Sequence, residues 1–167
     1  MLHALRDVSR YEAATGDFQV LVDIENDAAH LPDAIRGDRT VFMAQGTVDA
    51  AVDFTGITGD AIQVADDGSV TVILPEATLA EARIDSEESR IVARDRGLLD
   101  RLGDVLSDNP VDDRELYLRA EDRLGEAAAE AGLAARAETN TRRMLDGMLG
   151  SLGYDDVTVV FESPTAP

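Results

Sequence analysis

The chain has 167 residues, enough for one domain with a buried core and too few for two domains of ordinary size. It carries 34 acidic and 15 basic residues, a formal net charge of −19, and every basic residue is Arg. Because this charge repels phosphate, we expect neither nucleic acid nor anionic lipid headgroups as direct ligands. Cys is absent, which excludes disulfides and thiolate chemistry, and no apolar run approaches the roughly 18 residues of a membrane helix, so we expect the chain as given to be soluble.

The first part of the chain has the alternating pattern of strands. Val8 to Ala14 and Phe18 to Glu25 alternate polar and apolar residues, and Thr15-Gly16-Asp17 between them predicts a hairpin turn. After an irregular segment with Pro32, the stretch "TVFMAQGTVDAAVDF" (40–54) resumes the extended pattern, with Gly46 as a turn or bulge.

A second hairpin is predicted from Ala61–Ala65 and Ser69–Leu74. They flank Asp66-Asp67-Gly68, and Asp and Gly tolerate the positive φ of tight hairpin turns. Pro75 cannot donate to a ladder, so it ends the second strand. Residues 77–85 and 89–93 are further candidate strands.

The second arm of this hairpin leans apolar on both faces. Alternation places Val70, Val72 and Leu74 on one face and Thr71 and Ile73 on the other. We therefore expect cover on both sides, or an interface with another chain.

The last third of the chain is typical of helix. A short helix is expected from Leu98 to Leu106, and Asp108-Asn109-Pro110 then supplies a cap and a first-turn Pro. The following Ala-rich helix is predicted from Val111 to about Leu149, closed by Gly150 or Gly153, before a final strand at 157–162.

Two glycines interrupt this helix pattern. Gly125 and Gly132 either mark a bend or let another backbone come close. The Ala and Leu stripe favours packing on a sheet, while the small residues around Gly125, Ala128 and Gly132 leave pairing with a second copy as an alternative.

These elements predict an α+β fold: antiparallel strands in the first two thirds, a long Ala-rich C-terminal helix packed on the sheet, and a final strand. We expect a single domain over residues 1–167, with a strand-rich part at 1–95, a helical part at 96–153 and the closing strand within 154–162.

Few residues suggest chemistry, so we assign no catalytic, cofactor-binding or metal-binding residue and expect no cofactor. His3 and His30 have no partner ligand at metal-binding spacing. Four acid pairs fall in predicted turns or at helix ends, where solvated acids are ordinary: Asp66-Asp67, Glu87-Glu88, Asp112-Asp113 and Asp155-Asp156. Nucleotide-binding loops and nucleophile elbows do not occur.

A family resemblance runs over nearly the whole chain. The segments "AAVDFTGI" (50–57), "VTVILPEA" (70–77), "ARID" (82–85), "GLLDRL" (97–102) and "AAAEAGLAARAETNTRRMLDGMLGSLGYDDVTVVF" (127–161) resemble the bacterial domain of unknown function 4230 family. The resemblance implies a parent protein anchored by one N-terminal membrane helix, of which this chain is an excised portion. In layout it is also similar to stomatin and prohibitin domains, which assemble on membranes.

The leading hypothesis is a non-catalytic, envelope-associated or membrane-tethered interaction or scaffold domain that binds a protein partner or itself. It would contact a membrane only through an absent N-terminal anchor. The alternative is a small-molecule binder or hydrolase with a carboxylate-lined cleft, which requires carboxylates that converge in a concave pocket beside Arg or His.

Overall fold

The structure, a computed structural model, describes residues 9–26, 38–55, 59–95 and 111–163. The predicted helix Leu98–Leu106, the Pro110 cap, His3 and His30 lie outside these residues, as do the side chains of Asp112 and Asp113. The described part contains antiparallel strands, C-terminal helices and a final strand, which confirms the α+β fold.

The chain divides into two compact units. Unit 1 comprises Met1–Gly16, Asp49–Ala80 and Ala129–Pro167, and unit 2 comprises Asp17–Val48 and Glu81–Ala128. Each unit combines strands with part of the helical region, so the units do not follow the division at residues 95 and 153. That the two units form one domain stays a prediction.

Two long strands contribute to both units, and the first of them replaces the predicted N-terminal hairpin. β1 runs unbroken over Arg10–Asn26, so the hairpin turn predicted at Thr15-Gly16-Asp17 is wrong. β2 runs over Asp38–Asp53, and Gly46 lies at a regular strand position opposite Ile84. The register shift in β2 falls between Val41 and Phe42 instead.

Three shorter strands pair antiparallel with β2 in this five-stranded sheet: β5 (Thr78–Leu79), β6 (Arg83–Ile84) and β7 (Arg90–Asp95). The strand predicted at 77–85 is therefore two short strands, whereas the strand predicted at 89–93 is confirmed as β7.

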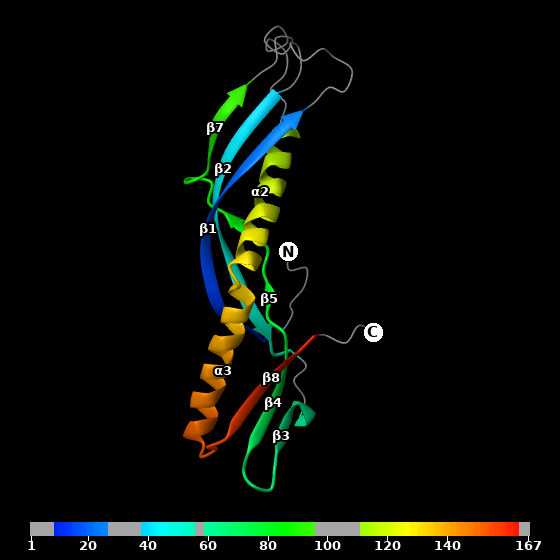
Figure 1. Cartoon of the computed structure of the whole chain (residues 1–167), viewed down its shortest axis with the longest axis vertical. Helices are drawn as coiled ribbons and strands as arrows, with labels where there is room; N and C mark the ends of the chain where they lie inside the picture. The colour runs from blue at the N-terminus through cyan, green and yellow to red at the C-terminus, as the bar shows by residue number, and fades with distance from the viewer. Residues whose placement is uncertain (1–8, 27–37, 56–58, 96–110, 164–167) are drawn as a thin grey trace, which may run out of the picture. The chain divides into compact units, whose positions relative to one another are not determined.

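The second sheet belongs to unit 1 (Figure 1). After the 3-10 turn η1 (Gly59–Ala61), β3 (Ile62–Val64) and β4 (Val70–Pro75) form the predicted antiparallel hairpin. β8 (Val157–Glu162) is the predicted final strand, but it pairs parallel with β4. Val70, Val72 and Leu74 are buried as one face, while Thr71 and Ile73 are half-buried on the other.

The predicted single helix is two helices, α2 (Val111–Glu130) and α3 (Leu133–Ser151). They are separated at Gly132, whose φ of 68° is left-handed and favours Gly. Gly132 thus marks a break, whereas Gly125 lies inside α2. After α3, Gly153 also takes a positive φ and leads the chain toward β8.

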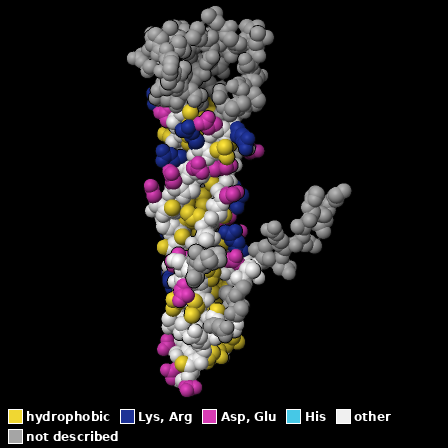
Figure 2. Space-filling model, turned by 90° about the vertical axis from the view of Figure 1, so that its right-hand side faces the viewer, with side chains coloured by type: hydrophobic (Ala, Val, Ile, Leu, Met, Phe, Trp, Pro, Cys, Tyr) yellow, Lys and Arg dark blue, Asp and Glu magenta, His cyan; other side chains and the backbone are white. Residues whose placement is uncertain are grey.

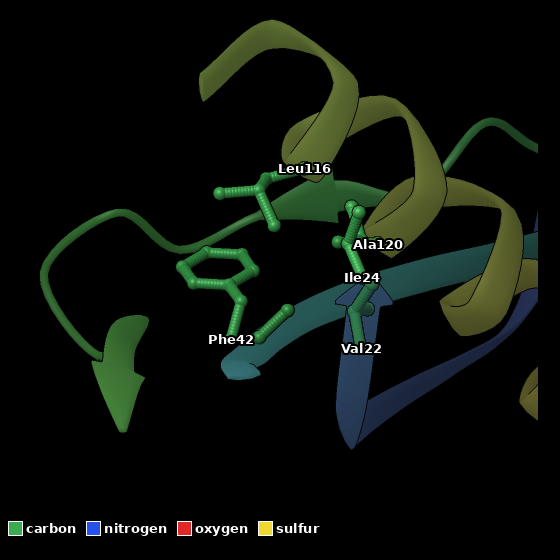
Figure 3. Packing of buried hydrophobic residues seen from close by; sticks show 6 residues of the cluster. Val22, Ile24, Phe42, Leu116 and Ala120 are labelled. Carbon is green, nitrogen blue, oxygen red and sulfur yellow. The ribbon is translucent and has the colours of Figure 1, made fainter. Parts of the chain in front are cut away.

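Each unit has its own apolar core. In unit 2, Val22, Ile24 and Phe42 point from β1 and β2 toward Leu116 and Ala120 of α2 (Figure 3). In unit 1, Leu145 of α3 packs on the buried face of β4, which confirms the prediction that the Ala-rich helical region covers sheet. The remaining buried members of that cluster are Val52, Val70, Val72 and Leu74.

Candidate functional site

The three predicted acid pairs whose side chains the structure describes are all exposed. Asp66 and Asp67 are exposed in the β3–β4 turn, and Asp155 and Asp156 are exposed before β8. The exposed pair Glu87 and Glu88 follows β6, in a turn that another carboxylate organises. The backbone N–H groups of Glu87 and Glu88 donate to Asp85 Oδ1 at 2.9 and 3.2 Å.

The β3–β4 turn shows why such acids are structural. Ser69 donates to Asp67 Oδ1 through its backbone N–H at 3.0 Å and through its hydroxyl at 2.8 Å. These two hydrogen bonds hold the pKa of Asp67 below its usual value. Gly68 adopts the positive φ, 86°, that the sequence predicts for this tight hairpin turn.

A hollow of about 420 Å³ lies in unit 2, between β1 and α2. Three carboxylates (Asp23, Asp122, Glu126) and two guanidinium groups (Arg119, Arg123) line it, together with Leu21 and Val22. Carboxylates therefore do converge beside Arg at this place, which is the arrangement that the small-molecule alternative requires.

Ion pairs organise the charges around this hollow. Arg39 Nη2 lies 2.6 Å from Asp23 Oδ2, and Arg123 Nη1 lies 2.8 Å from Glu126 Oε2. Arg119 Nη2 lies 2.7 Å from Glu115 Oε1, one turn away on α2. The partners in all three pairs are roughly half-exposed, so water screens their attraction and each pair contributes little to stability.

One carboxylate of the hollow, Asp23, has a lowered pKa. The hydrogen bond from Arg39 lowers the pKa of Asp23, whereas a general acid at neutral pH needs a raised pKa. Figure 2 shows one face of the molecule, on which Arg and acidic side chains are interleaved.

The small residues proposed for helix self-pairing are not one free stripe. Ala128 is fully buried in unit 2, while a Cβ at Gly125 would meet no heavy atom within 4 Å. Gly132 is used by the break between α2 and α3. Self-association of the chain through these small residues stays a prediction.

One buried carboxylate escaped the sequence reasoning. Asp49 is 3% exposed in β2, and it accepts a hydrogen bond of 2.8 Å from the Thr15 hydroxyl of β1. The signal was present, because Asp49 is an acid inside the apolar stretch from Val48 to Val52. Its hydrogen bonding makes it a link between two strands of the sheet.

The edges of the unit 1 sheet expose apolar side chains. In β3, Ile62 and Val64 are 47% and 57% exposed, and in β8, Val160 is 38% exposed. Both are outer strands in the order β3-β4-β8. Among the described residues neither outer edge pairs with a further strand, so backbone hydrogen-bonding groups and apolar side chains are presented together there.

Neither a membrane span nor a metal site is apparent in the described part. None of the described helices is long and apolar enough to cross a bilayer. Among the same residues, no three His, Cys or acidic side chains are grouped as metal ligands.

Comparison with known proteins identifies a family. The family model described as "Protein of unknown function (DUF4230)" matches residues 3–159. The chain belongs to the DUF4230 family. No curated protein and no solved structure matches this DUF4230 chain. The family assignment confirms the resemblance drawn from the strand and helix motifs, and the role of the DUF4230 chain has to be argued from its own surfaces.

Proposed function

We propose that this chain is a non-catalytic interaction domain, held at the cell envelope or membrane by its parent protein. The observation that carries the proposal is the pair of apolar edges, with Ile62 and Val64 on β3 and Val160 on β8. Single exposed apolar side chains are common on proteins. At a sheet edge, however, they accompany free ladder groups, and this combination is what strand-adding partners recognise.

The charges support binding rather than catalysis. The described acid pairs are exposed in turns or before β8, and the acids Asp23 and Glu126 in the hollow of unit 2 are paired with Arg. The tether to a membrane rests on the family resemblance alone. Fractionation of cells that produce the full-length parent tests the tether, since recovery of the parent only in the soluble fraction would contradict it.

Photo-crosslinking in the full-length parent tests the interaction role. A photoreactive phenylalanine is introduced at Val64 or Val160, and at Val92 of unit 2 as the matched exposed apolar control. We expect covalent adducts with another protein from the two edge positions and none from Val92. If neither edge position forms an adduct in cells, the proposed function is wrong.

The hollow between β1 and α2 favours a second candidate, a weak binder of a small polar molecule. Its carboxylates and guanidinium groups come from Asp23, Asp122, Arg119 and Arg123. Thermal-shift screening with amino acids and short carboxylic acids tests this function, with Arg119→Ala as the control that should lose any shift. Stabilisation by a ligand that Arg119→Ala abolishes would favour the binder.

A further inference from the structure

The outer edge of β8 has identifiable free backbone groups. Val70 N–H of β4 donates to Asp156 O at 2.8 Å, and Glu76 N–H donates to Glu162 O at 3.1 Å. In a parallel ladder this register directs the backbone groups of alternate β8 residues toward β4. The backbone groups of Val157, Val159 and Phe161 therefore point to the outer edge, which pairs with no other strand in the part of the chain that the structure describes.

This edge lacks the protection that another outer strand carries. β7 has Arg90, Arg94 and Asp95 among its six residues. Between Val157 and Phe161, β8 has only Thr and apolar residues, with no charge and no Pro. Natural edge strands are usually blunted by charge, Pro or bulges, so an unprotected edge of this length is a surface for pairing.

The outer face beside this edge is apolar. Val160 is 38% exposed, and its register partner Ile73 on β4 is half-buried on the same face. A strand added beside β8 would therefore place one side chain next to Val160 and extend the row that Ile73 begins. This contact would add apolar burial to the backbone hydrogen bonds.

The ends of β8 determine the charge of the partner. Asp155 and Asp156 precede the strand, and Glu162 ends it. A second copy paired in parallel would oppose Glu162 with Glu162, and an antiparallel copy would bring Glu162 near Asp156. Since the whole chain has a net charge of −19, a basic partner is favoured over a second copy at this edge.

We propose that the outer edge of β8 binds an extended segment of another protein, with an apolar, β-branched centre and basic residues at both ends, as an added strand. This proposal rests on the proposed interaction function and names the partner's chemistry. The centre would pair with the backbone of Val157, Val159 and Phe161, and the basic ends would lie against Asp155, Asp156 and Glu162.

Peptide binding to the full chain tests the proposal. The probe is a fluorescein-labelled peptide with a Val-Thr-Ile-Val centre and two Arg at each end, and binding is followed by fluorescence anisotropy. Two control peptides carry Glu in place of Arg, or N-methyl groups on the backbone of the centre. We expect each control to bind about tenfold more weakly or worse, a loss of about 1.4 kcal/mol. The Glu peptide brings like charge to the acids of β8, and the N-methylated peptide loses backbone hydrogen bonds.

Variants of the chain locate the bound peptide. Val160→Lys should weaken binding of the Arg peptide about tenfold, because Lys replaces the apolar contact with the peptide's centre and adds a like charge between its basic ends. Val92→Lys adds the same charge to an exposed Val in β7 and should leave binding unchanged. Circular dichroism of both variants checks folding, and Thr158→Lys, at another exposed β8 position, replaces Val160→Lys if the latter unfolds.

Three results would overturn the proposal. Equal binding of the Arg and N-methylated peptides would show charge attraction without strand addition. Equal weakening by Val160→Lys and Val92→Lys would place the peptide elsewhere. A dimer in sedimentation that Val160→Lys dissociates would make a second copy the occupant. Adducts at Val64 in the crosslinking experiment would leave the interaction function intact in each case.

Discussion

Replacing Gly46 with Ala adds a single methyl group, yet it should lower the free energy of unfolding of unit 2 markedly. A Cβ at Gly46 would lie 2.6 Å from Arg83 O, 2.8 Å from Leu124 Cδ1 and 3.2 Å from Ile84 Cα. The Leu124 side chain is fully buried, and the Arg83 carbonyl is backbone of the paired strand β6, which a side-chain rotation cannot relieve. Overpacking of this kind costs about 1–3 kcal/mol, and the backbone contact places Gly46→Ala at the upper end of that range.

Two other glycines provide matched controls for Gly46→Ala. A Cβ at Gly125 meets nothing within 4 Å inside α2, so Gly125→Ala should stabilise by about 0.5–1 kcal/mol through helix propensity. A Cβ at Gly132 also meets nothing, but its φ of 68° is unfavourable for Ala, so Gly132→Ala should destabilise by about 1 kcal/mol. The three variants separate steric contact, propensity and backbone strain.

Urea unfolding followed by circular dichroism measures these free energies. For a chain of this size, about 1 kcal/mol corresponds to a melting shift of roughly 2–4 °C, which thermal melts resolve. Leu124→Ala alone opens a cavity, so it is the reference for the double variant. In that background Gly46→Ala should still destabilise, because the contact with Arg83 O remains. No cost of Gly46→Ala in either background would refute the close approach of β2 to β6.

Three further outcomes are expected. Val72→Asp buries an unpaired charge at a position that is 4% exposed, so it should lower the free energy of unfolding by about 4 kcal/mol or more. Ile73→Asp lies on the half-buried face and should lower it less, and urea unfolding of the two variants compares them. With a net charge of −19, the melting temperature should rise from low salt to about 1 M, and a flat series would contradict self-repulsion. Hydrogen bonds lower three pKa values from 3.8: Arg39 donates to Asp23, Ser69 donates to Asp67, and Thr55 donates to Asp53, with its N–H bonded to Oδ1 at 2.7 Å. The stability that these contacts contribute is present above pH 3.8 and is lost as pH falls below it, so an absence of this loss in melts from pH 6 to about pH 2 would contradict them.

Local patterns predicted local structure. The β3–β4 hairpin follows from Asp67 and Gly68, whose turn geometry depends on neighbours within two residues. The α+β class and the final strand follow in the same way, because alternation and helical periodicity are properties of a short window. The family resemblance followed from these same motifs.

Predictions failed where distant partners decide the conformation. Thr15, Gly16 and Asp17 suit a turn, but the Thr15 hydroxyl donates to Asp49 and Asp17 accepts from Thr47, so pairing with β2 keeps β1 extended. Short polar residues permit either outcome, and only the partner strand selects one. The hollow was likewise beyond the sequence, since it joins residues of β1 to residues of α2.

The predicted function is only partly accessible by the same reasoning. The exposed positions of the three described acid pairs were predicted from turn composition. The open edge of β8 was not, because the parallel pairing with β4 determines which backbone groups remain outward. A strand pattern alone does not say on which side a strand is paired.

The parallel pairing of β4 with β8 also governs when unit 1 can fold during synthesis. Val70 meets Val157, so the hairpin of β3 and β4 emerges from the ribosome long before the strand that completes its sheet. Unit 2, by contrast, ends at Ala128. At about 5–20 residues per second, the apolar face of β4 waits for several seconds without α3 and β8. Until α3 and β8 have been synthesised, the apolar face of β4 is uncovered, and such exposed surface favours aggregation of the nascent chain.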